Sequence, residues 1–140
     1  MNTILVTTSR GLDELLKQEI LTLCPDAQIK LAPGMMQFEG SKEDAYRLCL
    51  WSRLANRVIW VLATGKANDA DALYDTAMSV DWQLHMASSH TLSVQFIGTN
   101  FAIKNTQFGA VKIKDAIVDQ FVEQGLARPS VERKLPDFSV

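Results

Sequence analysis

The fold is decided by residues 3–63, which read TILVTTSRGLDELLKQEILTLCPDAQIKLAPGMMQFEGSKEDAYRLCLWSRLANRVIWVLA. Strand-forming runs open and close this stretch, at residues 3–7 and 57–63. Between them lie two helical patterns and two further strand patterns, 28–31 and 35–39, which flank a turn at Pro33-Gly34. The expected order of elements is therefore β-α-β-β-α-β.

Both helical patterns carry a start signal and an apolar stripe. The first has Asp13 and Glu14 in its first turn, where the helix dipole favours carboxylates, and it ends at Pro25. The second begins at Ser41 with Asp44 three residues later, which is typical of a capping box. The stripes expected to face the core are Leu12, Leu15, Leu16, Ile20 and Leu23 in the first helix, and Ala45, Leu48 and Cys49 in the second.

This order predicts an α+β fold. A β-α-β-β-α-β sequence is the ferredoxin-like, or split βαβ, arrangement, in which two helices cover one face of an antiparallel sheet. We expect residues 1–64 to form this domain.

Residues 65–140 predict a second, α/β domain. A helix follows Asn68-Asp69 and presents Leu73, Ala77 and Val80, and residues 91–97 alternate like a strand. A long helix is expected over 106–124, before Gly125 and Pro129, with its core stripe at Ala110, Ile113, Ile117 and Phe121. Another strand begins at residue 137, so we expect this domain to be cut before its last strands.

The composition is that of a globular protein, with 47% hydrophobic and 21% charged residues. No apolar run approaches the roughly 20 residues that a bilayer requires, and no secretory signal is expected. Cys24 and Cys49 are expected to be buried free thiols, which fits a cytoplasmic location. Trp51 and Trp60 are expected in the core, and Trp82 as a cover over the second core.

No residues are expected to be catalytic, and none to bind a metal. His85 and His90 stand alone in a polar loop, and no glycine-rich cofactor loop is present. The carboxylates at Asp69, Asp71 and Asp75 are interpreted as a helix cap and a solvated face.

The basic residues of the last 40 positions are the candidate binding residues. Residues 1–100 carry 8 basic and 11 acidic side chains, whereas residues 101–140 carry 6 and 5. The start of the helix at residue 106 favours an anion through its dipole and free amides. The candidates for phosphate contact are Lys104, Asn105, Gln107, Lys112, Lys114, Arg128, Arg133 and Lys134, with Arg53 from the first domain. A solvated charged surface is the alternative interpretation of the same residues.

Three segments carry a resemblance to a known family. They are residues 8–19 (TSRGLDELLKQE), residues 50–57 (LWSRLANR), and residues 105–119 (NTQFGAVKIKDAIVD) with the following Arg128-Pro129 and Pro136-Asp137. In this order they resemble the N-terminal region of bacterial 23S rRNA guanine-N2 methyltransferases of the L type, alone or in the fused K/L form. That region consists of a ferredoxin-like domain and a THUMP domain, and the likeness covers essentially the whole chain.

The resemblance implies an RNA-binding front end without a catalyst. In this family a separate methyltransferase domain follows, uses S-adenosylmethionine, and carries an Asn-Pro-Pro-Tyr-like motif, which is why such proteins have also been called adenine-specific DNA methylases. No such motif occurs here, so no cofactor is expected in this chain. The implied partners are large-subunit rRNA and that downstream domain, with no membrane. The alternatives are a module of an adenine-specific DNA methylase and a non-catalytic protein-interaction domain.

Overall fold

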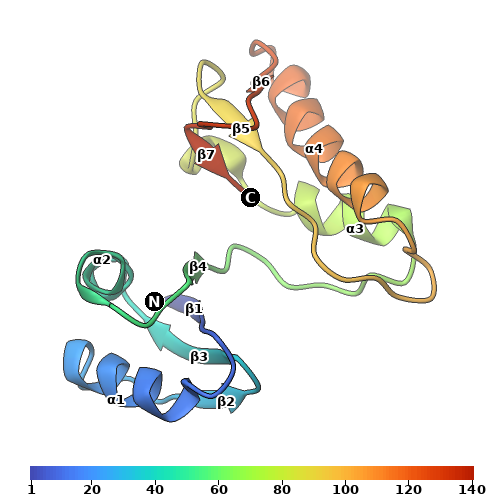
Figure 1. The fold of residues 1–140 in the computed structure, drawn as a ribbon. Helices are drawn as coiled ribbons and strands as arrows, with labels where there is room; N and C mark the ends of the chain where they lie inside the picture. The colour runs from blue at the N-terminus through green and yellow to red at the C-terminus, as the bar shows by residue number, and fades with distance from the viewer. The chain divides into compact units, whose positions relative to one another are not determined.

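The computed structural model describes residues 1–140 and divides the chain into two compact units, Met1–Leu62 and Ala63–Val140 (Figure 1). Each unit has its own sheet and its own helices.

The first unit has the predicted order of elements. These are β1 (Asn2–Thr7), α1 (Asp13–Leu23), β2 (Lys30–Ala32), β3 (Met35–Gly40), α2 (Lys42–Trp51) and β4 (Arg57–Trp60). The strands form one sheet in the order β2-β3-β1-β4, and every neighbouring pair is antiparallel. The ferredoxin-like arrangement is therefore confirmed.

The core of the first unit lies between one face of the sheet and the two helices. Alternate residues of the central strands point into it, and the register pairs Ile4 with Phe38 and Val6 with Met36. Burying apolar side chains in this way is the main force that holds the unit together. The fully buried helix residues that meet this face are Leu16, Ile20 and Leu48.

Three expectations about burial in this unit are wrong. Leu15 is 52% exposed and Trp51 is 68% exposed, and Cys49 is exposed as well. Each residue of a helix is rotated by about 100° from the one before, so Leu15 and Cys49 turn away while Leu16 and Leu48 face the core. Cys24 is buried as expected, and burial raises the pKa of its thiol to about 11.

The capping box that opens α2 is confirmed. Ser41 Oγ accepts a hydrogen bond from the Asp44 amide (3.1 Å), and the Ser41 amide donates to Asp44 Oδ2 (2.9 Å). The hydrogen bond from the Ser41 amide is the largest cause that lowers the pKa of Asp44. The sequence pattern thus fixes where the helix begins.

The second unit is an α/β unit built on a parallel sheet. Its elements are α3 (Ala70–Met78), a short 3-10 helix η1 (Trp82–Leu84), β5 (Thr91–Ser93), α4 (Thr106–Glu123), β6 (Ser130–Val131) and β7 (Phe138–Ser139). The strand order is β6-β5-β7, with both pairs parallel, and α3 packs along α4 (Figure 1). Asp69 caps α3 by accepting a hydrogen bond from the Ala72 amide, as predicted.

The strand predicted over residues 91–97 is shorter in the structure. β5 ends at Ser93, although the Gln95 amide still donates to the Val140 carbonyl (2.7 Å) and the Val140 amide to the Ser93 carbonyl (2.9 Å). Backbone hydrogen bonding to the segment after β7 thus continues past Ser93 as far as Gln95.

The core of the second unit contains one polar side chain, that of Gln120, beside the large aromatic side chain of Trp82. Trp82 is 2% exposed, and its indole N–H donates to the Ala77 carbonyl (2.8 Å). Gln120 is 8% exposed and lies on the α4 face that turns inward. The apolar side chains buried with them are Ala77, Val80, Met86, Leu92, Ile103, Ala116, Ile117, Val118 and Phe121. None of the helices of either unit is long and apolar enough to span a membrane.

Candidate nucleic-acid interface

The first group of predicted binding residues surrounds the N-terminal end of α4. Asn105 is the N-cap, and its Oδ1 accepts hydrogen bonds from the amides of Gln107 (2.9 Å) and Phe108 (3.3 Å). These amides, expected to attract a phosphate, are thus already satisfied within the protein. The first turn holds no acidic side chain and Lys104 is exposed just before it, so positive charge remains at this end.

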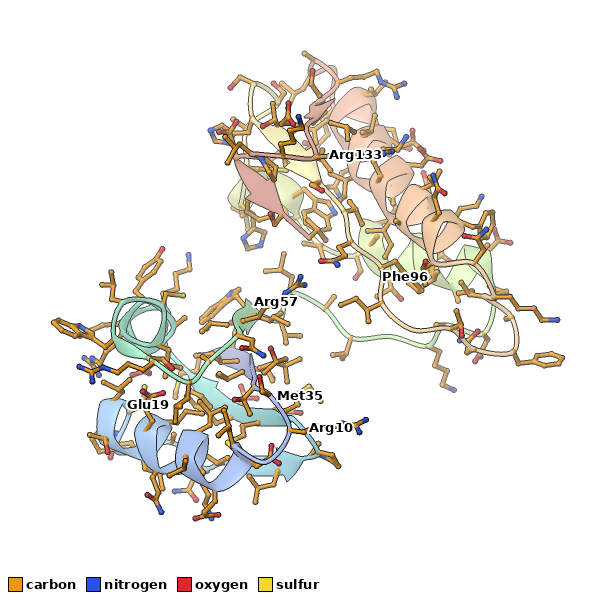
Figure 2. The ribbon with its side chains drawn as sticks, in the orientation of Figure 1. Arg10, Glu19, Met35, Arg57, Phe96 and Arg133 are labelled. Atoms are coloured by element: carbon orange, nitrogen blue, oxygen red, sulfur yellow. The ribbon has the colours of Figure 1, made fainter.

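A close contact fixes this end of α4 against the preceding loop. Gly109 is buried, and a Cβ atom there would lie 2.8 Å from the ring of Phe96, which Figure 2 labels. That distance is too short for any side chain, so only glycine permits the ring to touch the helix backbone.

The two lysines within α4 have different surroundings. Lys112 Nζ lies 5.7 Å from the centroid of the Phe108 ring, in cation–π range. Lys114 Nζ lies 2.6 Å from Asp115 Oδ1, and its side chain is 27% exposed. Two residues correspond to about 200° around a helix, so the lysines point to different sides of α4. Of the two, Lys112 is the more available to a phosphate.

The second group of predicted residues follows the C-terminal end of α4. Gly125, with φ of 74°, takes the left-handed conformation that ends the helix. Arg128, Arg133 and Lys134 are all exposed, and the last two lie between β6 and β7. Figure 2 labels Arg133.

Hydrogen bonds hold the segment between β6 and β7 in place. The amide and hydroxyl of Thr91 donate to Asp137 Oδ2, and the Asp137 amide donates back to Thr91 Oγ1. The bond from the Thr91 amide is the largest cause that lowers the pKa of Asp137. The Lys134 amide also donates to Glu132 Oε1 (2.8 Å). Both basic side chains therefore project from an ordered turn.

The structure separates these residues into two groups. We call Lys104, Asn105, Gln107 and Lys112 the N-terminal basic group, and Arg128, Arg133 and Lys134 the C-terminal basic group. The first group lies just before α4 and within its first half, and the second group follows the helix, which has 18 residues and is roughly 27 Å long at about 1.5 Å per residue. A single phosphate cannot contact both groups, whereas an extended nucleic acid can.

An acidic face of α4 adjoins Lys112 of the N-terminal basic group, which lies three residues before Asp115 on the same side of the helix. Asp115, Asp119 and Glu123 follow one another at intervals of four residues, which places them on one side of the helix. The hydroxyl of Tyr74 donates to Asp119 Oδ2 (2.7 Å), and this hydrogen bond is the main cause that raises the pKa of Tyr74 to about 12. This face packs toward α3 and would repel a phosphate.

Arg53, the ninth candidate, belongs to the first unit and sits in a loop held by Glu19. Glu19 accepts hydrogen bonds from the Ser52 hydroxyl (2.6 Å) and from the amides of Arg53 (2.8 Å) and Leu54 (3.3 Å). Burial raises the pKa of Glu19, but these hydrogen bonds outweigh it, so the pKa lies below its usual value. Sequence reasoning missed Glu19 because its partners lie 33 to 35 residues away. Figure 2 labels Glu19 on α1.

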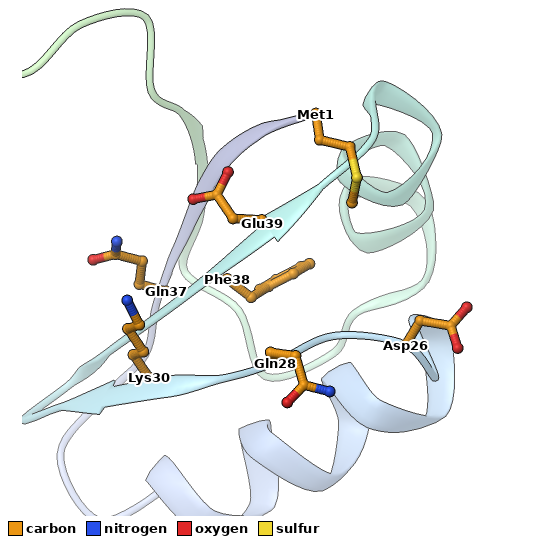
Figure 3. A pocket seen from close by; sticks show the side chains of 7 residues that line it. All are labelled: Met1, Asp26, Gln28, Lys30, Gln37, Phe38 and Glu39. Carbon is orange, nitrogen blue, oxygen red and sulfur yellow. The ribbon is translucent and has the colours of Figure 1, made fainter.

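A pocket of about 270 Å³ lies in the first unit (Figure 3). Its lining mixes both signs of charge and contains no serine, cysteine or histidine. Nowhere in the chain do three His, Cys, Asp or Glu side chains lie close enough together to hold a metal ion. The pocket therefore offers no evident chemistry. Its lining residues are Met1, Asp26, Gln28, Lys30, Gln37, Phe38 and Glu39.

Apolar exposure on α4 is modest. Phe108, Val111 and Val122 are 45%, 44% and 48% exposed. Lys112 covers part of the Phe108 ring, and Asp115 lies between the two valines on the same side of the helix. This is a small surface for docking another protein.

The chain thus consists of two units, and the second carries exposed basic residues toward both ends of α4. Residues 3–59 match the sequence model of the RlmL ferredoxin-like domain, and residues 67–140 match that of the THUMP domain. The second match alone covers more than half of the chain. The chain belongs to the THUMP domain family.

Several curated relatives of this chain are much longer proteins. Ribosomal RNA large subunit methyltransferase K/L of Alteromonas mediterranea is 84% identical over 140 residues, which is 100% of this chain and 20% of that protein. The chain spans about a fifth of the length of the curated relatives it matches.

Solved structures share the fold at low identity. A predicted N6-adenine-specific DNA methylase from Listeria monocytogenes matches with a TM-score of 0.76 and 21% identity, over 93% of this chain and 35% of that one. A putative methyltransferase named SMU.472, solved in complex with SAH, matches with a TM-score of 0.76 and 19% identity, over 92% and 35%.

Proposed function

We propose that this chain is the RNA-binding front end of an S-adenosylmethionine-dependent methyltransferase that modifies the exocyclic N2 amine of a guanine in 23S rRNA. The observation that carries the proposal is 84% identity, over all 140 residues, to a large-subunit rRNA methyltransferase. The chain itself is non-catalytic. Catalysis and the cofactor belong to the part of the protein beyond it, and the protein acts in the cytoplasm.

Residues 1–64 and 65–140 are the proposed limits of the ferredoxin-like and THUMP domains, the second cut before its last strands. The N-terminal and C-terminal basic groups contact phosphates of a folded or A-form RNA segment. Lys114, which is paired with Asp115, and Arg53 are the remaining proposed contacts. Such contacts position the RNA and carry no base information, so recognition depends on shape. The roughly 27 Å length of α4, which lies between Lys104 and Arg128, matches about eight steps of a duplex at ~3.4 Å each.

The test compares the full-length protein with a variant that lacks residues 1–140. Both receive protein-free 23S rRNA and S-adenosylmethionine with a labelled methyl group. We expect the parent to methylate a guanine at N2, and the truncated variant to bind S-adenosylmethionine normally but to require far more RNA for the same rate. Equal RNA dependence of the two proteins would contradict the proposal.

A salt titration tests the basic groups. Each lysine that neutralises a phosphate contributes about one to the slope of log affinity against log salt concentration. Lys104→Ala, Lys112→Ala and Lys134→Ala in the full-length protein should each reduce the slope by about one. Lys42→Ala is the matched control, because Lys42 is exposed on α2, outside both groups. If all three variants keep the parent slope and affinity, the two basic groups do not bind RNA.

A second candidate function is a module of an adenine-specific DNA methylase. The fold similarity to the Listeria monocytogenes protein is the observation that favours it. Competition binding separates the two, since an rRNA fragment should displace labelled rRNA at far lower concentration than duplex DNA of equal length. The reverse order would favour the DNA methylase.

A further inference from the structure

Phe101 is the most exposed large apolar side chain of the protein, at 94%. Leaving an aromatic ring in water forgoes the stabilisation that burial would give. It lies in the connection between β5 and α4, three residues before Lys104 of the N-terminal basic group.

A tight turn places Phe101 at its tip. Asn100 Oδ1 accepts hydrogen bonds from the amides of Ala102 (2.9 Å) and Ile103 (2.7 Å), and the Asn100 amide donates to the Ile103 carbonyl (3.0 Å). A side chain that bonds to the backbone two residues on is the usual way in which asparagine stabilises a turn. The ring therefore projects from an ordered backbone.

The base of this turn is anchored to the second unit on both sides. Ile103 is 1% exposed, in the core. Asn100 Nδ2 donates to the Ala67 carbonyl (2.8 Å). The tip is thus held between two fixed points, and the backbone that carries Phe101 needs no rearrangement to meet a partner, which lowers the entropy lost on binding.

Positive charge flanks the ring. Lys104 comes directly after the turn, and Lys66 comes directly before Ala67, to which the turn is bonded. Both lysines are exposed. The carboxylate nearest to Lys66 in sequence, Asp69, accepts the capping hydrogen bond of α3 (2.7 Å). An aromatic ring beside lysines is the combination that binds an unpaired nucleotide, because the base stacks on the ring and the lysines meet the phosphates.

We propose that Phe101 stacks on an unpaired base of the bound RNA while Lys104 and Lys66 contact the adjoining phosphates. This rests on the proposed function and adds to it that the RNA has a single-stranded segment next to the N-terminal end of α4. A protein partner is the competing occupant. It would use apolar area of any kind, including the neighbouring Ile97, which is 74% exposed.

The test uses the full-length protein and two RNA probes. One is a hairpin with a single-stranded extension that carries the fluorescent base analogue aminopurine at successive positions, and the other is the same hairpin with a blunt end. For the parent we expect tighter binding of the extended probe and quenching of the analogue at one position. Phe101→Ala should weaken binding of the extended probe at least about fivefold, as expected for one lost base–aromatic stack, and abolish the quenching.

The controls separate stacking from charge and from protein docking. Phe101→Ala should leave the salt slope unchanged, whereas Lys104→Ala should reduce it by about one. Phe101→Trp should retain quenching, and Ile97→Ala should bind both probes like the parent. Unchanged affinity and quenching in Phe101→Ala would overturn the stacking proposal while RNA binding stands. Equal losses for both probes, or a loss in Ile97→Ala equal to that in Phe101→Ala, would overturn it too. Failure of the parent to bind either probe would remove RNA binding itself.

Discussion

Replacing Gln120 with alanine removes the polar side chain that ties α4 to the segment between α3 and η1. Its Oε1 accepts a hydrogen bond from the Trp82 amide (2.9 Å). Its Nε2 donates to the carbonyls of Met78 (3.1 Å) and Val80 (2.8 Å). All three bonds link residues about 40 positions apart, so they stabilise only the folded unit.

The cost follows from these bonds. Leaving the buried Trp82 amide without a partner costs about 1–3 kcal/mol, and each lost hydrogen bond to a carbonyl about 1 kcal/mol. The sum is about 3–5 kcal/mol. The unit Ala63–Val140 has 78 residues, which at about 0.05–0.15 kcal/mol per residue gives roughly 4–12 kcal/mol in total. Gln120→Ala should therefore remove a quarter or more of the stability of this unit.

The assay is hydrogen exchange across a urea series, read from peptides of α4 and compared with peptides of α1 in the first unit. In the variant we expect hydrogen exchange in α4 to be faster than in the parent, and hydrogen exchange in α1 to be unchanged. The matched control is Gln124→Ala, an exposed glutamine of the same helix end, which should change stability by less than about 0.5 kcal/mol. A loss below about 1 kcal/mol in Gln120→Ala would show that water or a shifted backbone replaces these bonds.

Three further changes test other contacts. Glu19→Gln should speed hydrogen exchange of residues 52–54 at neutral pH. Because the folded pKa of Glu19 lies below 4.5, the stability that its carboxylate contributes is present above that pH and is lost as the pH falls through the folded pKa. The difference between variant and parent should therefore vanish in acid. Tyr74→Phe should lower the urea midpoint slightly. Because the folded pKa of Tyr74 is raised from 10 to about 12, the difference in urea midpoint between variant and parent should be largest below pH 10 and should disappear as the pH rises through 12. Gly109→Ala should destabilise the second unit by about 1–3 kcal/mol by overpacking the Phe96 ring, and the loss should shrink when Phe96 is also replaced with alanine; additive effects would show that the two do not touch.

The element order of the first unit and both α-helices of the second could be predicted from the sequence because they depend on local patterns, whereas η1 and β6 were not predicted. Each of these signals involves residues only a few positions apart. They are the capping box of Ser41 and Asp44, the N-cap at Asp69, and the left-handed Gly125 that ends α4. Such signals act through the backbone nearby and need no knowledge of the rest of the chain.

Burial was predicted less well. Cys49 and Trp51 are apolar and helical in context, yet both are exposed. Whether an apolar residue is buried depends on how far the sheet extends beneath the helix, and only Leu48 of α2 reaches the fully buried core. Apolar composition alone leaves this open, because folded proteins also expose much apolar surface.

The candidate site divides in the same way. The identities of Lys104, Arg128 and the other basic residues are visible in the sequence, and so is the position of α4. Only the tertiary structure shows that Asn105 accepts hydrogen bonds from the amides at the start of α4 and that Lys114 is paired with Asp115. It also shows that Phe101 lies in a turn held by hydrogen bonds of Asn100.

What the sequence by itself determined is the order of the α-helices and of every strand except β6, together with the supply of charged side chains. What only the tertiary structure decided is which of those side chains are already satisfied and which face solvent. The contacts of Glu19 with Ser52 and of Gln120 with Trp82 span 33 and 38 residues. These contacts form because core packing closes long loops of the chain. No local sequence pattern indicates which distant groups that packing brings together.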